Sequence, residues 1–195
     1  DVSNNAFTGT IPSHIFDLPD LALLALSANC FSGELPTTIC RAKSLQTLVI
    51  AGLSSGSGCR RKFWEGTAFA ETFNGFTATV FMQGEIPQCI FALPHIKNVH
   101  AGGNAFSGSI PEKVPLNLRT LDLSRNRLTG TISKELATAA ASPHGINELR
   151  LDFNLVEGTL DVFRGFEAHV FNDDLSARGE GGGHGVEGSG LIYKN

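Results

Sequence analysis

The stretch Asn5-Ala6-Phe7-Thr8-Gly9-Thr10-Ile11-Pro12 returns 24 residues later as Asn29-Cys30-Phe31-Ser32-Gly33-Glu34-Leu35-Pro36. Asn at the first position, an apolar residue at the third and Gly at the fifth recur in 104–111, 126–132 and 154–160. Five copies indicate one structural unit that is repeated along the chain. Such units stack on their neighbours, because a single unit cannot bury its apolar face alone.

A short apolar alternation precedes the Asn of each unit. In Leu24-Ala25-Leu26, three residues before Asn29, apolar side chains occupy the first and third positions. A period of two predicts a strand whose outer two side chains point into the core while the middle one points outward. The equivalent triplets are 48–50, 99–101, 121–123 and 149–151. The sequence therefore predicts a row of three-residue strands.

Strand and turn together resemble the L-x-x-L-x-L-x-x-N-x-L-x-G-x-I-P pattern of plant-type leucine-rich repeats, over about residues 1–160. Receptor-like ectodomains and polygalacturonase-inhibitor-like proteins share this pattern. The resemblance implies an α/β leucine-rich-repeat solenoid of about six 24-residue repeats. In such a right-handed coil, a short-stranded parallel sheet lines the concave face, and irregular, 3-10 or short helical segments form the convex side. Since Asp1 falls inside a repeat, we expect a longer protein.

The Asn of each unit is expected to turn its amide inward. There it donates to and accepts from backbone groups that the bend after the strand leaves unpaired. Loss of such a partner typically costs about 1–3 kcal/mol. The predicted ladder consists of Asn5, Asn29, Asn104, Asn126 and Asn154.

The third repeat departs from the pattern. Leu53 stands where the ladder Asn belongs, and the expected Gly arrives only at Gly84. From Gly33 to Gly84 is 51 residues instead of 24, so 27 residues are inserted, as an island at about 54–82. Inserts of this length in a compact fold are usually functional or disordered, and the aromatic residues of this one argue against disorder.

The island allows two interpretations. Its aromatic rings either pack onto the solenoid as a small core, or they project as a contact site for a partner. Trp and Arg dominate the hot spots of protein interfaces. The candidate contact residues are Arg60, Arg61 and Trp64.

Four cysteines, Cys30, Cys40, Cys59 and Cys89, fit either a disulfide-bearing secreted domain or buried thiols. The favoured pairing joins Cys40 to Cys59, which would hold the island on the solenoid and leave Cys30 and Cys89 free. A bond between Cys59 and Cys89, or four free thiols, are the alternatives.

The pattern decays beyond residue 160. We expect residues 161–195 to form a degenerate capping repeat and a glycine-rich tail, with 191–193 as a closing strand. In the sixth repeat, the additional residues within 139–145 are expected to lengthen a convex-side helix or loop.

The charge and composition of the chain limit which partners and which cellular location are expected. A net charge of −4 without a long basic run argues against nucleic acid. No window approaches the roughly 18–20 apolar residues of a membrane span, so this segment is not expected to insert, and a signal or anchor would lie outside it. Four cysteines favour an extracellular or cell-surface location, although no Asn-x-Ser/Thr sequon is present.

Motifs for catalysis are weak. The stretch 52–56 matches G-x-S-x-G, but its glycine- and serine-rich continuation is a poor helix, which that motif requires. Neither the histidines nor the cysteines show metal-ligand spacing. Asp122 and Asp152 are spaced one repeat apart, and Arg125 and Arg150 beside them favour an ion-paired surface over an acid–base pair. We therefore predict no enzyme, no cofactor and no metal.

The outward-facing strand positions define the predicted partner surface. Its N-terminal half is small and apolar, whereas its C-terminal half is charged, which suits a protein or peptide partner. A structural subunit held permanently in a larger assembly and an inhibitor of a secreted hydrolase are the alternative functions. The predicted contact residues are Ala25, Val49, His100, Asp122, Arg125, Arg150 and Asp152.

Overall fold

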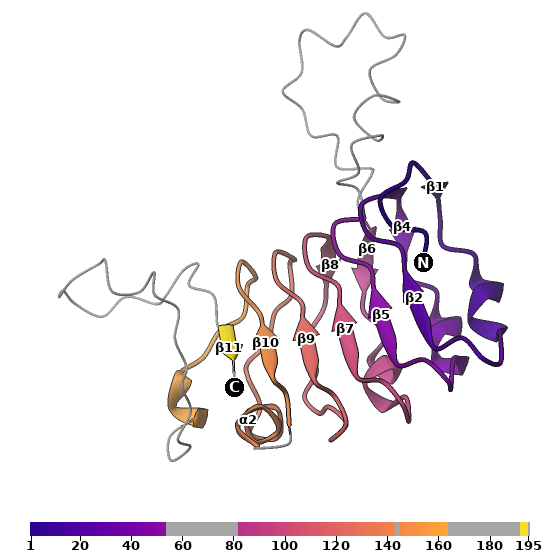
Figure 1. The fold of residues 1–195 in the computed structure, drawn as a ribbon. Coiled ribbons are helices and arrows are strands. Elements are labelled where there is room, and N and C mark those ends of the chain that lie inside the picture. The colour runs from indigo at the N-terminus through magenta and orange to yellow at the C-terminus, as the bar shows by residue number, and fades with distance from the viewer. Residues whose placement is uncertain (54–81, 143–144, 164–191, 195) are drawn as a thin grey trace, which may run out of the picture.

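The computed structural model describes residues 1–53, 82–142, 145–163 and 192–194. Its main element is a six-stranded sheet whose strands lie side by side along the stack (Figure 1). Its strands are β2 (Leu23–Ala25), β5 (Thr47–Val49), β7 (Asn98–His100), β9 (Thr120–Asp122), β10 (Glu148–Arg150) and β11 (Ile192–Lys194). In this sheet β2, β5, β7, β9 and β10 are parallel, and each pairs with the next one along the chain. This arrangement confirms the predicted leucine-rich-repeat solenoid.

The register of the sheet builds the core. The middle residues of the strands pair in one row, in which Leu24 lies opposite Leu48 and Val99 opposite Leu121. All four are at most 5% exposed, and they join one continuous buried cluster. One apolar row per repeat therefore runs along the stack, and each coil is stabilised mainly by its neighbours.

A second, three-stranded sheet runs beside the first and contains β4 (Gly33–Glu34), β6 (Met82–Glu85) and β8 (Ala105–Ser107). At the N-terminal end, β1 (Thr8–Gly9) pairs with β3 (Cys30–Phe31). Strand β6 lies between β4 and β8, so the third repeat resumes at Met82 in the place that a regular repeat would occupy. Most of the predicted island, residues 54–81, lies outside the described residues.

Short helices form the other side of the coils. Three of them directly follow a proline, Pro12, Pro36 or Pro87, which occupies the N-cap position. In the repeat where Ser133 replaces that proline, an α-helix forms instead, and the Ser133 hydroxyl accepts from the backbone N–H of Leu136 at 3.0 Å. The helices are η1 (Ser13–Asp17), η2 (Thr37–Arg41), η3 (Gln88–Ala92), α2 (Lys134–Ala141) and η4 (Leu160–Phe163).

The asparagine side chains link successive coils. Asn126 donates to the carbonyl groups of Leu123 in its own repeat and Ala101 in the preceding one, both at 3.0 Å. Its Oδ1 accepts from the backbone N–H of Phe106, also at 3.0 Å. Asn29, Asn104 and Asn154 make the corresponding bonds. The exposed Asn5, at the start of the chain, donates to the carbonyl groups of Val2 and Ser3.

The predicted Cys40–Cys59 disulfide is wrong. Cys40 bonds to Cys89 instead, with their Cα atoms 5.5 Å apart. Both lie on the convex side, Cys40 in η2 and Cys89 in η3, and these helices belong to consecutive coils. Stacking therefore brings together two cysteines that are 49 residues apart in the sequence. Cys30 is also disulfide-bonded rather than free, and Cys59 lies outside the described residues.

Two further segments of the chain form backbone hydrogen bonds with the outermost parallel strands of the main sheet, β2 and β10. At the β2 edge, Val2 and Asn4 donate their backbone N–H groups to the carbonyl groups of Ala25 and Ser27, each at 2.9 Å. At the other edge, β11 pairs with β10 in the antiparallel direction, with Tyr193 opposite Leu149. The predicted closing strand is thus present in the backbone, while residues 164–191 before it lie outside the described part.

Candidate recognition face

The exposed face of the main sheet consists of two outward-facing columns, which we call the recognition face. In each strand the middle side chain points into the core, so the side chains on either side of it point away from the core. Within each column, residues of neighbouring strands lie directly opposite one another. The first column is Leu23, Thr47, Asn98, Thr120 and Glu148, and the second is Ala25, Val49, His100, Asp122 and Arg150.

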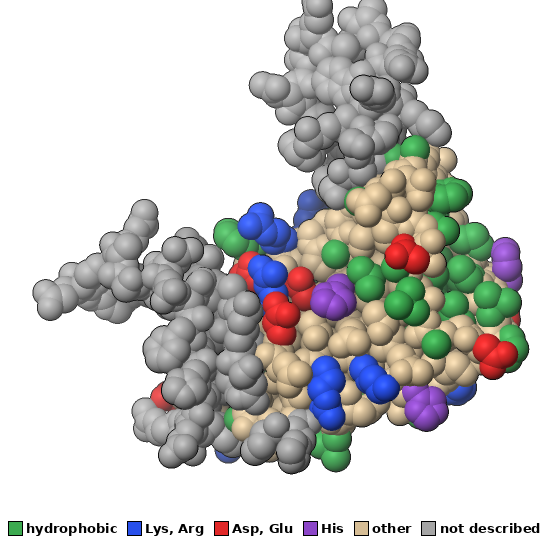
Figure 2. All heavy atoms as spheres, in the orientation of Figure 1, with side chains coloured by type: hydrophobic (Ala, Val, Ile, Leu, Met, Phe, Trp, Pro, Cys, Tyr) green, Lys and Arg blue, Asp and Glu red, His purple; other side chains and the backbone are tan. Residues whose placement is uncertain are grey.

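The character of the recognition face changes along the stack. Figure 2 shows hydrophobic side chains gathered over the β2 and β5 end and charged side chains gathered toward β10. At the apolar end Leu23 is 49% exposed, whereas Ala25 is only 6% exposed. Ala25 therefore offers a partner little surface, in contrast to the expectation for this position, because its short side chain does not reach beyond its neighbours. Leu23 is the larger apolar contact here.

The charged end is an ion-paired cluster that spans two repeats. The Arg150 guanidinium lies between two carboxylates, with Nη1 3.9 Å from Asp122 Oδ2 and Nε 3.7 Å from Asp152 Oδ1. Asp122 Oδ1 is held by Ser124, which donates its backbone N–H at 3.0 Å and its hydroxyl at 2.7 Å. These contacts fix the Asp122 side chain beside Arg150, so the two aspartates are linked through one guanidinium.

Asp152 is the most buried charged group of this cluster. The residue is 5% exposed, and its Oδ1 is buried without a hydrogen bond. Arg150 Nε is likewise buried without a hydrogen bond, since 3.7 Å is too long for one. Arg150 Nε and Asp152 Oδ1 thus face each other without a hydrogen bond, although a buried charge ordinarily forms hydrogen bonds.

Arg125 and Phe153 form the rim beside this cluster. The Arg125 guanidinium carbon lies 4.6 Å from the centre of the Phe153 ring, and Phe153 is 58% exposed. Both residues have positive φ, 53° and 55°, at the position directly before the ladder asparagine. This backbone turn directs both side chains to one rim. Sequence reasoning missed Phe153, whose position before Asn154, equivalent to that of Arg125 before Asn126, was the available signal.

Several predicted residues cannot be placed. Arg60, Arg61 and Trp64 of the island, and Ser54 of the G-x-S-x-G match, lie outside the described residues. In the described ranges, no three His, Cys, Asp or Glu side chains are grouped closely enough to hold a metal ion. The helices found there are all too short or too polar to span a membrane.

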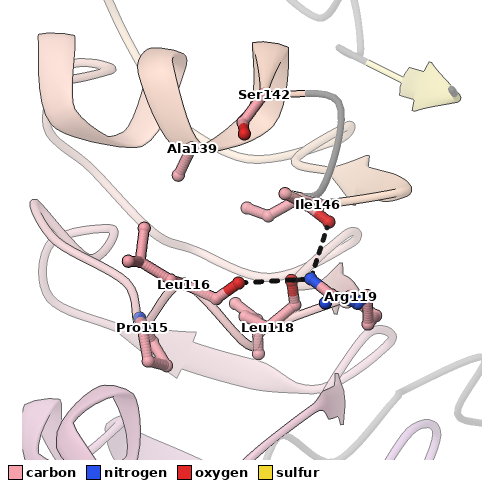
Figure 3. A pocket seen from close by; sticks show the side chains of 8 residues that line it. Pro115, Leu116, Leu118, Arg119, Ala139, Ser142 and Ile146 are labelled. Atoms are coloured by element: carbon pink, nitrogen blue, oxygen red, sulfur yellow. Dashed lines mark hydrogen bonds between the residues drawn. The ribbon is translucent and has the colours of Figure 1, made fainter.

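A small pocket of about 220 Å³ lies away from the recognition face, between α2 and the loop that precedes β9 (Figure 3). Its lining is mostly aliphatic and includes Leu116, Leu118 and Ile146. The Arg119 guanidinium donates to the carbonyl groups of Leu116 and Gly145, both at 3.2 Å. Arg119 therefore ties two loops together, which is a structural role.

Comparison with known proteins agrees with this fold. The family model "Leucine Rich Repeat" matches residues 117–139. Receptor-like protein 35 of Arabidopsis thaliana is 32% identical over 163 residues, which cover 82% of this chain and 14% of that protein. Receptor-like protein 18 of the same plant is 30% identical over 138 residues, or 70% of this chain and 13% of that protein. The chain thus spans about one seventh of the length of these relatives.

Two solved structures are similar to most of the chain. One is the Arabidopsis receptor kinase HAESA in complex with the peptide hormone IDA and the co-receptor SERK1. It is 32% identical to this chain, with a TM-score of 0.60, and the match covers 83% of this chain and 22% of the HAESA chain. A plant ice-binding protein is 26% identical with a TM-score of 0.58, covering 84% of this chain and 43% of that protein. Repeat pattern, fold and these likenesses agree: the chain is a plant-type leucine-rich-repeat protein, similar to part of the ectodomains of receptor-like proteins.

Proposed function

We propose that this chain is a non-catalytic recognition module that binds a protein or peptide partner through the recognition face. The observation that carries the proposal is the division of that face into an apolar end at Leu23 and Val49 and a charged end at Asp122 and Arg150. A polypeptide can present both kinds of side chain along its length, which suits this division. The HAESA ectodomain, which shares this fold, is solved with a peptide hormone.

The location agrees with such a role. The likeness to receptor-like proteins and receptor ectodomains indicates an extracellular or cell-surface protein. The Cys40–Cys89 disulfide fits the oxidising environment outside the cell. The similarity to an ice-binding protein shows that the fold supports more than one function. Partner recognition therefore depends on the side chains of the recognition face and not on the fold alone.

The test is capture of partners from plant extracellular fluid with the immobilised full chain, measured by quantitative mass spectrometry. The face variant is Asp122→Asn, which removes one acidic charge and keeps side-chain length. Its matched control is Glu135→Gln, which removes one acidic charge from an exposed position on α2. Native circular dichroism of each variant confirms that it is folded.

We expect a set of proteins or peptides that the wild type and the α2 variant capture equally, and that the face variant captures at least several-fold less. Equal capture by both variants would contradict the use of the recognition face. Replacing residues 54–81 by a short linker, which keeps Met82 in β6, adds a separate test of the proposed contact site at Arg60, Arg61 and Trp64. Selective loss in that deletion would assign recognition to the island.

A further inference from the structure

The charged end of the recognition face carries more negative than positive charge. Arg150 is shared by two carboxylates, Asp122 at 3.9 Å and Asp152 at 3.7 Å, so the three groups together carry a formal charge of −1. Arg125, the next cation, is positioned over the Phe153 ring and makes no ion pair with a described residue. One guanidinium therefore leaves the second carboxylate uncompensated.

The cluster also has unused hydrogen-bond acceptors. Asp152 Oδ1 is buried and accepts no hydrogen bond, although the Asp152 side chain is only 7% exposed. Asp122 Oδ1 accepts two bonds from Ser124, whereas Oδ2 accepts none from the described residues and points toward Arg150. A buried carboxylate oxygen without a donor is costly, and the facing Arg150 Nε does not supply one at 3.7 Å. A group that brings N–H donors within hydrogen-bond distance would therefore be stabilised here.

We propose that Asp122 and Asp152 form a subsite for a cationic side chain, Lys or Arg, of the partner. The inference rests on the proposed function and names the chemistry that the charged end would recognise. Arg150 is the only side chain within 4 Å that now neutralises these acids in the described structure, and both of its ion pairs are longer than a hydrogen bond. Its side chain is 35% exposed, so it can move aside as a ligand cation binds.

A ligand carboxylate fits the same site poorly. It would reach Arg150 only beside Asp122 and Asp152, and like charges at such distances repel each other. A ligand cation instead gains a charge-assisted hydrogen bond to Asp122 or Asp152, and such bonds are about twice as strong as neutral ones. The net negative charge and the carboxylate oxygens without donors thus both favour a cationic ligand.

The test needs no knowledge of the natural partner. The ¹⁵N-labelled full chain is titrated with N-acetyl-arginine amide, and binding is followed by amide chemical shifts. N-acetyl-glutamine amide and N-acetyl-glutamate amide are the neutral and anionic probes. We expect the arginine probe to bind with a Kd on the order of millimolar, as a ligand of this size allows. The shifts should be confined to β9, β10 and the residues that follow each strand, and added salt should weaken binding.

Three variants make the assignment specific. Asp122→Asn and Asp152→Asn should each weaken binding of the arginine probe about tenfold. Arg150→Gln should tighten it, because the competing internal cation is gone. Asp17→Asn is the matched control, since Asp17 forms an exposed ion pair with Arg41 at 3.2 Å on the other side of the coil. Asp17→Asn should leave binding unchanged.

The subsite is wrong if the glutamine probe causes the same shifts, if the arginine probe causes none on β9 and β10, or if Arg150→Gln weakens binding. Should Asp152→Asn not fold, Asp122→Asn and Arg150→Gln decide the question. These outcomes are separate from the proposed function. Face-dependent capture of a partner without binding of the arginine probe would overturn the subsite alone, and binding without such capture would overturn the proposed function alone.

Discussion

The Glu34 side chain occupies the space that a side chain at Gly84 would need: a β-carbon built on Gly84 would lie 2.9 Å from Glu34 Cγ. Glu85 and Gly108 repeat this relationship one coil later, at 3.0 Å. The residue after the turn glycine of one coil thus packs over the turn glycine of the next. The positive φ that these turn glycines share, 77° at Gly84, explains why glycine recurs at the fifth position of each unit, and the close contact adds to this requirement at Gly84 and Gly108.

Gly84→Ala should lower the free energy of unfolding by about 1–3 kcal/mol, because it adds backbone strain to the contact with Glu34. Gly130→Ala is the comparison, since its φ of 96° brings similar strain while the nearest atom is 3.6 Å away. Urea unfolding should show the larger loss at Gly84, and adding Glu34→Ala should recover the difference. Equal losses would mean that packing of Glu34 has no part.

Asn126→Leu should destabilise the protein by about 1–3 kcal/mol in the same assay, because it leaves buried backbone groups without partners. Asn147→Leu is the control. Asn147 is exposed and its side chain makes no hydrogen bond with a described residue, so the change is expected within about 0.5 kcal/mol. Similar effects at the two positions would contradict the ladder as a source of stability.

Arg150→Ala should cost about 1–2 kcal/mol, because it removes the cation beside the buried Asp152. The cost is below that of a fully buried pair, since the Arg150 side chain is 35% exposed. Adding Asp152→Asn should restore most of the lost stability. Arg41→Ala, at the exposed Asp17–Arg41 pair, should change it by less than about 0.5 kcal/mol. If Asp152→Asn lowers stability further in the Arg150→Ala background, the ion pair does not explain the loss.

Cys40→Ala/Cys89→Ala should lower the free energy of unfolding by about 4 kcal/mol, as the chain-entropy model gives for a loop of 49 residues. Peptide mapping of the non-reduced protein should first find a peptide that joins Cys40 to Cys89. A Cys40–Cys59 peptide would contradict the pairing. Reducing the wild type should bring its stability to that of the variant or below.

The features that the sequence predicts well are those encoded within one repeat. The alternation in 24–26 and the asparagine after it depend on local geometry, and both recur often enough to set the register of the whole stack. The recognition face follows from the same alternation, since the residue between two buried leucines must point outward. Positions such as His100 and Asp122 could therefore be assigned to one column before any coordinates were known.

The features that the sequence predicts poorly depend on contacts between repeats. Cys40 and Cys89 become neighbours only when the insert is discounted and consecutive convex helices are stacked. The burial of Asp152 depends on side chains from adjacent coils, which the pattern of one repeat does not contain. Phe153 was missed because the position before the ladder asparagine recurs in each repeat without a fixed residue type, and its exposure follows from a left-handed backbone turn.

The antiparallel β11 changes what an extended ligand would meet beside β10. Strands β2, β5, β7 and β9 run parallel to β10, whereas β11 runs against it, with Tyr193 opposite Leu149. A peptide that adds to a sheet pairs with the outermost strand, and its backbone hydrogen bonds supply affinity with little regard to sequence. Such a peptide would pair with β11, so β10 contributes to recognition through its outward-facing side chains and not through its backbone. Discrimination at β10 thus rests on a few surface positions, which substitution can change one at a time without altering the coil beneath them.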